Sequence, residues 1–278
     1  MKARRAFDPV LLLAAPALAY MALVFALPVL ILIIGSFKGP GGPTTAAYTA
    51  FLSDAFNWRV IGNTLRVAAL TSLVCLVLGY PTAVALARSR GAVQAGLLIA
   101  IILPLSVGVI VKAFAWQIVL RRDGIVSAVL VATGVWDAPQ LMLFTEPGLV
   151  IGAANVFLPF MILPIYSVLK LIDPNLQASA ATLGAPPLYR FFKLALPMAM
   201  PGIISGAAIV FSLSAAMYVI PTLLIGDRFQ TLATLTARAF LLMRNEQLGS
   251  TTATILLVLA VSIVMLSARL VRAAGDSR

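Results

Sequence analysis

The chain of 278 residues is too apolar for a soluble globular protein, since 62% of its residues are hydrophobic, 10% are charged and the mean hydropathy is +1.05. Soluble proteins carry about a quarter charged residues, so lipid must solvate much of this chain. The net charge of +11 does not indicate nucleic acid, because the basic residues punctuate the apolar segments instead of forming one stripe. Histidine is absent, and we expect no catalytic residue, metal site or cofactor in this chain.

Six apolar stretches are long enough to cross a bilayer, at roughly 10–36, 67–87, 93–113, 148–171, 197–222 and 249–268. Backbone polar groups in lipid must be bonded within their own segment, so each stretch is predicted to be a helix. The first stretch runs far past any signal-peptide cleavage point, which predicts a retained helix. We therefore predict an all-α integral membrane protein with about six transmembrane helices, forming a single domain over residues 1–278.

The basic turn Arg88-Ser89-Arg90 lies between the second and third stretches. Cytoplasmic loops of membrane proteins are enriched in Lys and Arg, so this turn is predicted to be cytoplasmic. With six crossings, both termini then also lie in the cytoplasm. The loops on the other side are longer, and in residues 37–62 a Gly/Pro-rich turn precedes aromatic residues that predict a short interfacial helix (Tyr48, Phe51, Leu52, Phe56 and Trp58).

The segment after the fourth stretch predicts a cytoplasmic helix–turn–helix. Asp173 or Asn175 can cap a short helix that runs through Thr182. Gly184 follows where that helix must stop, as a glycine with a left-handed backbone would. Pro186-Pro187 can open the next helix, because an early proline has no intrahelical donor to lose.

These residues resemble the EAA loop of ABC-importer permeases. That pattern reads Glu-Ala-Ala, three residues, Gly-Ala, then a Phe and a Leu-Pro. The matching positions are Gly184, Ala185, Phe191 or Phe192, Leu196 and Pro197, and the Glu-Ala-Ala positions are occupied by Ala178, Ser179 and Ala180. The family's glutamate is thus absent. Asn63-Thr64-Leu65 and Leu78-Gly79-Tyr80-Pro81 are also similar to permeases of spermidine/putrescine, opine and phosphonate importers, and the resemblance covers essentially the whole chain.

The resemblance implies a permease subunit of a type I ABC importer in a bacterial inner membrane. Its partners would be two ABC ATPase subunits, a second permease subunit, homologous or identical, and an extracytoplasmic substrate-binding protein. The coupling loop, about residues 172–196, would sit in a groove on the ATPase. The cargo would be a small polar solute such as a polyamine, an opine or a phosphonate. The chain lacks a phosphate-binding loop of its own, so ATP hydrolysis would belong to a separate subunit.

Four residues are candidates for lining the pathway. Lys112 lies near the outer end of the third stretch, and a charge at the bilayer centre costs roughly 2.5–3.5 kcal/mol. It either snorkels to the interface or lines the pathway, with Trp116 one turn later on the same face. Asn155 either bonds to a neighbouring helix or lines the pathway, and Tyr218 is a further candidate. None of the six stretches contains Asp or Glu, which favours an anionic or zwitterionic cargo over a polyamine.

Two other classes of protein are disfavoured by what the sequence lacks. An ion-coupled secondary transporter commonly uses intramembrane acids and inverted repeats. A membrane-embedded lipid-modifying enzyme would need clustered Asp, Glu or His at the interface. Neither pattern is visible, so the importer subunit is the preferred interpretation.

Overall fold

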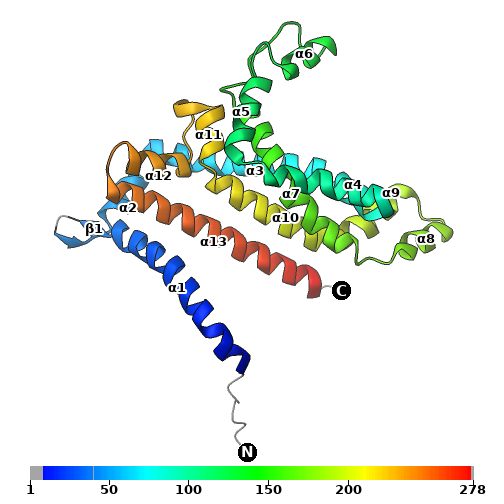
Figure 1. The fold of residues 1–278 in the computed structure, drawn as a ribbon, viewed down its shortest axis with the longest axis horizontal. Coiled ribbons are helices and arrows are strands. Elements are labelled where there is room, and N and C mark those ends of the chain that lie inside the picture. The colour runs from blue at the N-terminus through cyan, green and yellow to red at the C-terminus, as the bar shows by residue number, and fades with distance from the viewer. Residues whose placement is uncertain (1–8, 40, 277–278) are drawn as a thin grey trace, which may run out of the picture.

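The computed structural model describes residues 9–39 and 41–276, and it consists almost entirely of helices (Figure 1). The basic residues Lys2, Arg4 and Arg5 lie outside the described residues. In chain order the elements are α1 (Pro9–Ser36), β1 (Lys38–Gly39), β2 (Gly42–Pro43), α2 (Ala46–Ser53), α3 (Ala55–Arg88), α4 (Gly91–Ile102), η1 (Leu103–Ser106), α5 (Val109–Val119), α6 (Ile125–Ala132), α7 (Glu146–Leu169), α8 (Pro174–Thr182), α9 (Pro187–Arg190), η2 (Phe191–Ala195), α10 (Leu196–Ala216), α11 (Val219–Leu224), η3 (Gly226–Arg228), α12 (Leu232–Leu241) and α13 (Glu246–Asp276).

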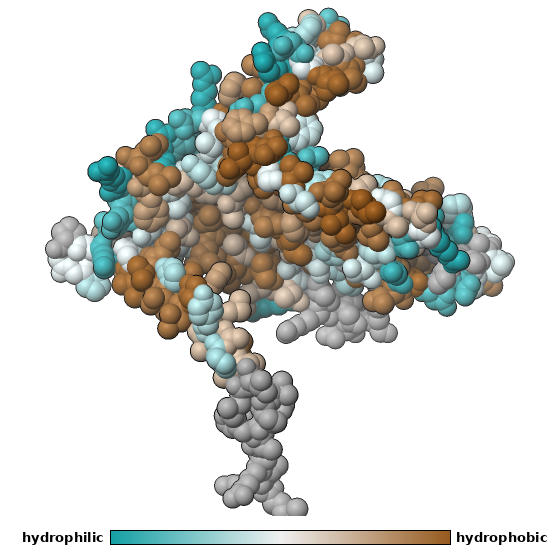
Figure 2. All heavy atoms as spheres, in the orientation of Figure 1, coloured by the Kyte–Doolittle hydropathy of each residue, from teal (hydrophilic) through white to brown (hydrophobic). Residues whose placement is uncertain are grey.

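The predicted all-α membrane fold is confirmed. Within the described residues, five helices are long and apolar enough to cross a membrane, and a bent pair of helices makes a possible sixth crossing. Hydrophobic residues cover the middle of the bundle, and hydrophilic residues gather toward its ends (Figure 2). A bilayer placed across the middle of the bundle therefore meets mainly apolar side chains.

The prediction of one continuous third helix over 93–113 is wrong. α4 ends at Ile102, and a 3₁₀ turn follows. The axis of α5 is then bent by 99° from that of the segment before it. Pro104 lies in that turn and has no N–H for a helical bond, and Gly108 has an extended ψ of 143°. Lys112 therefore belongs to the first turns of α5 and not to the end of a straight span.

The fifth helix also differs from the predicted 197–222. A continuous apolar helical segment begins at Pro187 and ends at Ala216, where Met217 is extended with ψ 133°. Pro221 explains the break, because a proline cannot donate to the carbonyl four residues earlier and its ring collides with it. That carbonyl belongs to Met217, and α11 begins only after it.

Residues 37–62 do not form a single interfacial helix. β1 and β2 pair as a small antiparallel hairpin, with Lys38 opposite Pro43, and α2 follows it. Phe56 and Trp58 belong instead to α3, which begins about one dozen residues before the predicted second stretch. The Asp54 carboxylate caps α3 by accepting from the Phe56 N–H at 2.8 Å, so the helix starts in the polar segment before the apolar run.

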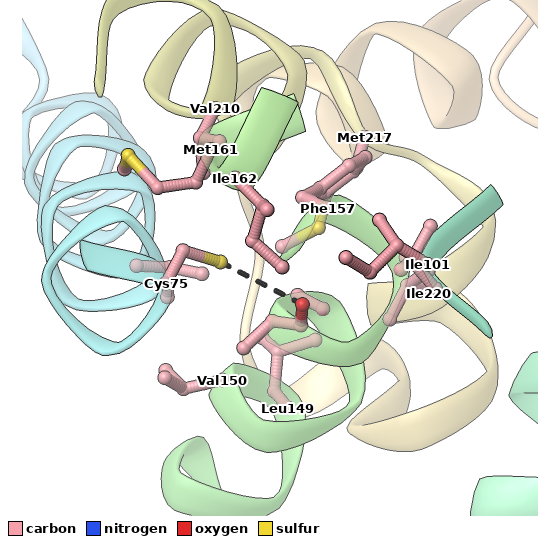
Figure 3. Packing of buried hydrophobic residues seen from close by; sticks show 14 of the residues in the cluster. Cys75, Ile101, Leu149, Val150, Phe157, Met161, Ile162, Val210, Met217 and Ile220 are labelled. Atoms are coloured by element: carbon pink, nitrogen blue, oxygen red, sulfur yellow. Dashed lines mark hydrogen bonds between the residues drawn. The ribbon is translucent and has the colours of Figure 1, made fainter. Parts of the chain in front are cut away.

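The core lies where α3, α7 and α10 meet (Figure 3). Cys75 of α3 is fully buried there, and its Sγ lies 3.6 Å from the Ala154 carbonyl oxygen of α7. Met161 and Ile162 of α7 and Val210 of α10 fill the same cluster. Cys75 therefore packs as a small hydrophobic residue.

Small residues let α7 and α10 approach closely, because Gly202 and Gly206 lie four residues apart on one face of α10. A Cβ atom added to Gly202 would lie 2.8 Å from the Pro164 carbonyl oxygen and 2.9 Å from the Ile165 Cα. A Cβ on Gly206 would lie 3.0 Å from the Met161 Sδ. Only glycine fits at position 202, and a side chain at 206 would require Met161 to shift by a few tenths of an ångström, so the relative position of the two helices depends on both glycines.

The long helices carry the chain back and forth between two ends of the bundle. Figure 1 places α8 and α9 at one end and α2 and α12 at the other. The short turn between α3 and α4 lies at the α8–α9 end. The two ends therefore correspond to opposite sides of a membrane.

Labelling of single cysteines tests which side each end faces. Thr45→Cys and Arg228→Cys should react with a membrane-impermeant maleimide from outside intact cells, whereas Ser89→Cys and Leu183→Cys should react only after permeabilisation. Gly42 and Gly226 are less suitable, because their φ angles of +124° and +70° strain any other residue. The parent chain is the control, since its buried Cys75 should stay unlabelled. Labelling of Ser89→Cys from outside would contradict this topology.

Candidate functional site

The segment after α7 folds as the predicted helix–turn–helix. The Asp173 carboxylate accepts a hydrogen bond of 2.8 Å from the Asn175 N–H, so Asp173, and not Asn175, caps α8. α8 ends at Thr182, as the sequence predicts. This cap satisfies a backbone donor that would otherwise be unpaired at the helix start.

Gly184 stops α8 with a left-handed backbone, as predicted. Its φ is +80°, and the Ala185 N–H donates to the Ala180 carbonyl at 3.0 Å, which is the long bond of a Schellman motif. A Cβ at Gly184 would meet no atom within 4 Å. Glycine is favoured here because of the backbone conformation alone, and not because neighbouring atoms would collide with a side chain.

The second half of the loop differs from the prediction. Pro186 is extended with ψ 155° and α9 opens at Pro187, as expected from the two prolines. The helix then continues through η2, which is a π-helix, directly into α10. The fifth apolar stretch is predicted to begin at 197, and Pro197 lies within the first turn of α10, inside one continuous helical segment. Early prolines are compatible with a helical first turn, which explains why the sequence suggested a start there.

Aromatic rings join the loop to α3. The Phe191 ring meets the Tyr80 ring edge-on with centroids 5.8 Å apart, and it meets the Phe192 ring at 4.9 Å and 87°. Edge-to-face pairs of this kind contribute about 0.5–1.5 kcal/mol beyond their buried area. Tyr80 belongs to the motif Leu78-Gly79-Tyr80-Pro81, whose spacing does not predict a contact with the loop.

The loop presents apolar side chains that the rest of this chain leaves uncovered. Leu171 and Leu183 are each 87% exposed, and Leu188 is 73% exposed. Ser179 of α8 is also exposed, while Ala180 and Ala185 are half-buried. α8 contains Ala178, whose side chain lies outside the described part of the structure. An exposed apolar group of this kind is typical of a surface that binds another protein.

The four pathway candidates do not form one cluster. Lys112 is half-buried on α5, and Trp116, one turn later, packs against the core beside Gly152 of α7. Asn155 is exposed on α7, and so its side chain points away from the chain's own core. Tyr218 lies at the break between α10 and α11, and it lines a pocket that the other three candidates do not line.

That pocket is partly open, has a volume of about 140 Å³ and lies between η3, α12 and the break before α11. Its lining includes Tyr218, Thr222, Asp227, Gln230, Thr234 and Arg238. Figure 1 places this region at the end of the bundle opposite the α8–α9 loop. Sequence reasoning had identified only Tyr218 among these residues.

The motif Asn63-Thr64 has a structural role that its sequence did not reveal. The Asn63 side chain donates to the Gln230 carbonyl at 3.1 Å, and the Thr64 hydroxyl accepts from the Leu232 N–H at 2.8 Å. These bonds attach the start of α12 to α3. Nearby, the Arg66 guanidinium pairs with the Glu146 carboxylate at 2.8 Å and joins α3 to the start of α7.

Comparison with known proteins agrees with this architecture. Residues 79–274 match the family described as binding-protein-dependent transport system inner membrane component. The chain is 32% identical to the spermidine/putrescine transport system permease protein PotB of Haemophilus influenzae, over 69% of this chain and 67% of the relative. It is 31% identical to PotB of Escherichia coli K12, over 79% of each chain.

Solved structures share the fold at low sequence identity. A bacterial ABC transporter involved in the import of the acidic polysaccharide alginate has a TM-score of 0.75 at 18% identity and 92% coverage of both chains. The MetNI methionine ABC transporter has a TM-score of 0.59 at 19% identity, over 78% of this chain and 94% of that chain. With a family match over most of the chain, this protein belongs to the binding-protein-dependent transport system inner membrane component family: it is a multi-pass membrane permease subunit of a type I ABC importer and not an enzyme.

Proposed function

We propose that this chain forms, with a second permease subunit, the pathway for a small polar solute across a bacterial inner membrane. Two ATPase subunits bind on the cytoplasmic side, where both termini also lie, and a substrate-binding protein delivers the cargo from the other side. The observation that carries the proposal is the α8–α9 loop, a rigidly capped turn with exposed leucines at one end of the bundle. It fits a surface that docks into a groove of the ATPase.

The loop has the two properties that coupling requires. Its outer surface is apolar at Leu183 and Leu188, so docking removes apolar area from water, at about 25 cal/mol per Å². Its inner end continues into α10 without a break, so that a displacement of the loop moves a membrane helix directly. The ring contact between Phe191 and Tyr80 extends that movement to α3.

The missing glutamate changes how this loop binds. Ala178 stands where the family pattern has an acid, so the contact at this position lacks a carboxylate. Docking through the exposed leucines compensates for the missing carboxylate. The loop's shape does not depend on that acid, because the Asp173 cap and the Gly184 turn define both ends of α8.

Two classes of cargo follow from different observations. The relatives at 31–32% identity are spermidine/putrescine permeases, which supports an amine cargo of the polyamine type. Lys112 supports an anionic or zwitterionic cargo, such as an opine or a phosphonate, if it faces the pathway. A lysine in a site of low dielectric attracts carboxylate or phosphonate and repels a polyamine.

Co-purification tests the assembly. A tagged chain, expressed together with its neighbouring transport genes, should retain an ATPase through detergent purification. Replacing Leu183 and Leu188 together by Glu should reduce the retained ATPase by about tenfold or more, because charges replace the apolar contacts. Val135→Glu, at a 65% exposed site away from the loop, is the control and should retain the ATPase. Parental retention in the double variant would remove the loop from the interface.

Substitution of Gly184 tests coupling. Alanine in the left-handed region costs about 1 kcal/mol and valine more, so Gly184→Val should keep membrane insertion but uncouple ATP hydrolysis from uptake, with Gly184→Ala intermediate. Gly96→Ala is the control, since a Cβ there also meets no atom within 4 Å but its φ is ordinary. The measurement is uptake per ATP hydrolysed in proteoliposomes. Wild-type coupling in Gly184→Val would show that the turn is dispensable.

Lys112 variants separate the two classes of cargo. Lys112→Met keeps most of the stem and removes the charge, whereas Lys112→Arg keeps the charge. If Lys112 lines the pathway, Met should lower uptake of 2-aminoethylphosphonate by about tenfold, the effect of one lost charged contact, while Arg largely preserves it. Putrescine uptake should not fall. If the reconstituted Lys112→Met complex transports the phosphonate at the parental rate, Lys112 is an interfacial anchor.

A further inference from the structure

The pocket between η3, α12 and the α10–α11 break contains two opposite charges that do not form a hydrogen bond. The Arg238 Nη1 and the Asp227 Oδ1 are 3.9 Å apart, which is too long for one. The Asp227 side chain is 88% exposed and that of Arg238 40%. An exposed pair of this kind contributes about 0–1 kcal/mol, so a ligand can separate the two groups at little cost.

The amide of Gln230 adds an acceptor without a partner. Its Oε1 is buried and lacks a hydrogen bond within the described part of the structure. The backbone around Gln230 is anchored to α3, because the Gln230 carbonyl accepts from the Asn63 side chain and the Leu232 N–H donates to the Thr64 hydroxyl. A buried acceptor left unpaired costs about 1–3 kcal/mol, and it becomes available to a donor when the Gln230 side chain turns toward the pocket that this residue lines.

The threonine hydroxyl groups of the pocket are already engaged. Thr222 donates to the Tyr218 carbonyl at 2.8 Å, and Thr234 donates to the Thr231 carbonyl at 3.0 Å and accepts from its N–H at 2.8 Å. Besides the Tyr218 hydroxyl, the groups that remain for a ligand are the Asp227 carboxylate, the Gln230 amide oxygen and the Arg238 guanidinium. Two of them accept hydrogen bonds from a cation, and the third donates to an anion.

We propose that this pocket binds the zwitterionic end of the cargo, an ammonium and a carboxylate carried on the same carbon. The ammonium lies between Asp227 and Gln230, and the carboxylate pairs with Arg238. A polyamine would bring a cation beside Arg238, and a simple anion would bring a second negative charge beside Asp227, so each meets a repulsive partner. The volume of about 140 Å³ is below the roughly 300–1,000 Å³ of pockets for drug-sized ligands, so only one end group enters.

The location of the pocket suits a contact made on entry. It lies at the end opposite the α8–α9 loop, beside the point where α10 stops and the chain turns into α11. This proposal rests on the proposed import function, because the bound group is taken to belong to the cargo. In this proposal the pocket beside Tyr218 recognises the charged end group, and Lys112 is not part of that pocket.

Binding of two matched probes tests the proposal. L-Ornithine and putrescine share a carbon chain with terminal amines, but only ornithine carries a carboxylate beside an ammonium. The full chain, purified with its ATPase and placed in nanodiscs, should give saturation-transfer NMR signals for ornithine. Putrescine should bind about tenfold more weakly, since it lacks one charge-assisted contact and meets Arg238.

Variants identify the groups responsible. Arg238→Gln and Asp227→Asn should each weaken ornithine binding by about tenfold, whereas Arg238→Lys should keep most of it. Arg228→Gln, an exposed cation of η3 outside the pocket lining, is the matched control and should bind as the parent does. Retention of the ATPase in every variant shows that the chain is folded and assembled.

Three results would overturn the proposal: equal binding of putrescine and ornithine, no binding of ornithine to the parent, or parental binding in both Arg238→Gln and Asp227→Asn. Each leaves the import function standing as long as the ATPase co-purifies. Conversely, ornithine binding to a chain that never retains an ATPase would support the pocket and contradict the proposed function. Ligand binding therefore tests the pocket, and co-purification of the ATPase tests the import function.

Discussion

The close approach of α7 to α3 and α10 is the constraint on which the other features depend. Met161 of α7 lies between two glycines, because a Cβ on Gly79 of α3 would be 3.0 Å from its Cγ and one on Gly206 of α10 would be 3.1 Å from its carbonyl oxygen. Lipid is as apolar as these side chains, so the helices associate through tight packing and not through burial from water. Since α10 continues from α9, this contact also determines where the α8–α9 loop lies relative to the membrane helices.

The loop and the pocket occupy opposite ends of the same rigid framework. α10 begins in the loop and ends at the break beside Tyr218, so one helix connects the two regions. A π-helical segment lies at its start, and such segments are frequent at functional sites. A movement imposed on the loop thus has a direct mechanical route to the pocket, through a helix held against α7 by Gly202 and Gly206.

The sequence predicted the features that depend on local backbone chemistry. The left-handed glycine at 184 and the Asp173 cap both follow from properties of single residues and their immediate neighbours. The 99° bend after α4 was missed, because the apolar run continues through it and hydropathy does not register a change of direction. The Asp227–Arg238 pocket was missed as well, since its residues come together only when α12 is attached to α3 by Asn63 and Thr64.

The position of α1 has a consequence for biosynthesis. Its main contact is with α13, where Gly35 lies against Ser250, and the apolar window of α1 is otherwise uncovered by this chain. α13 leaves the ribosome after every other helix described here, so α1 must remain in the lipid without its partner while the α3–α7–α10 core assembles. The tertiary structure then closes in one late step, in which the first and final membrane helices pair, and a chain stalled before α13 would hold a formed core with a free first helix.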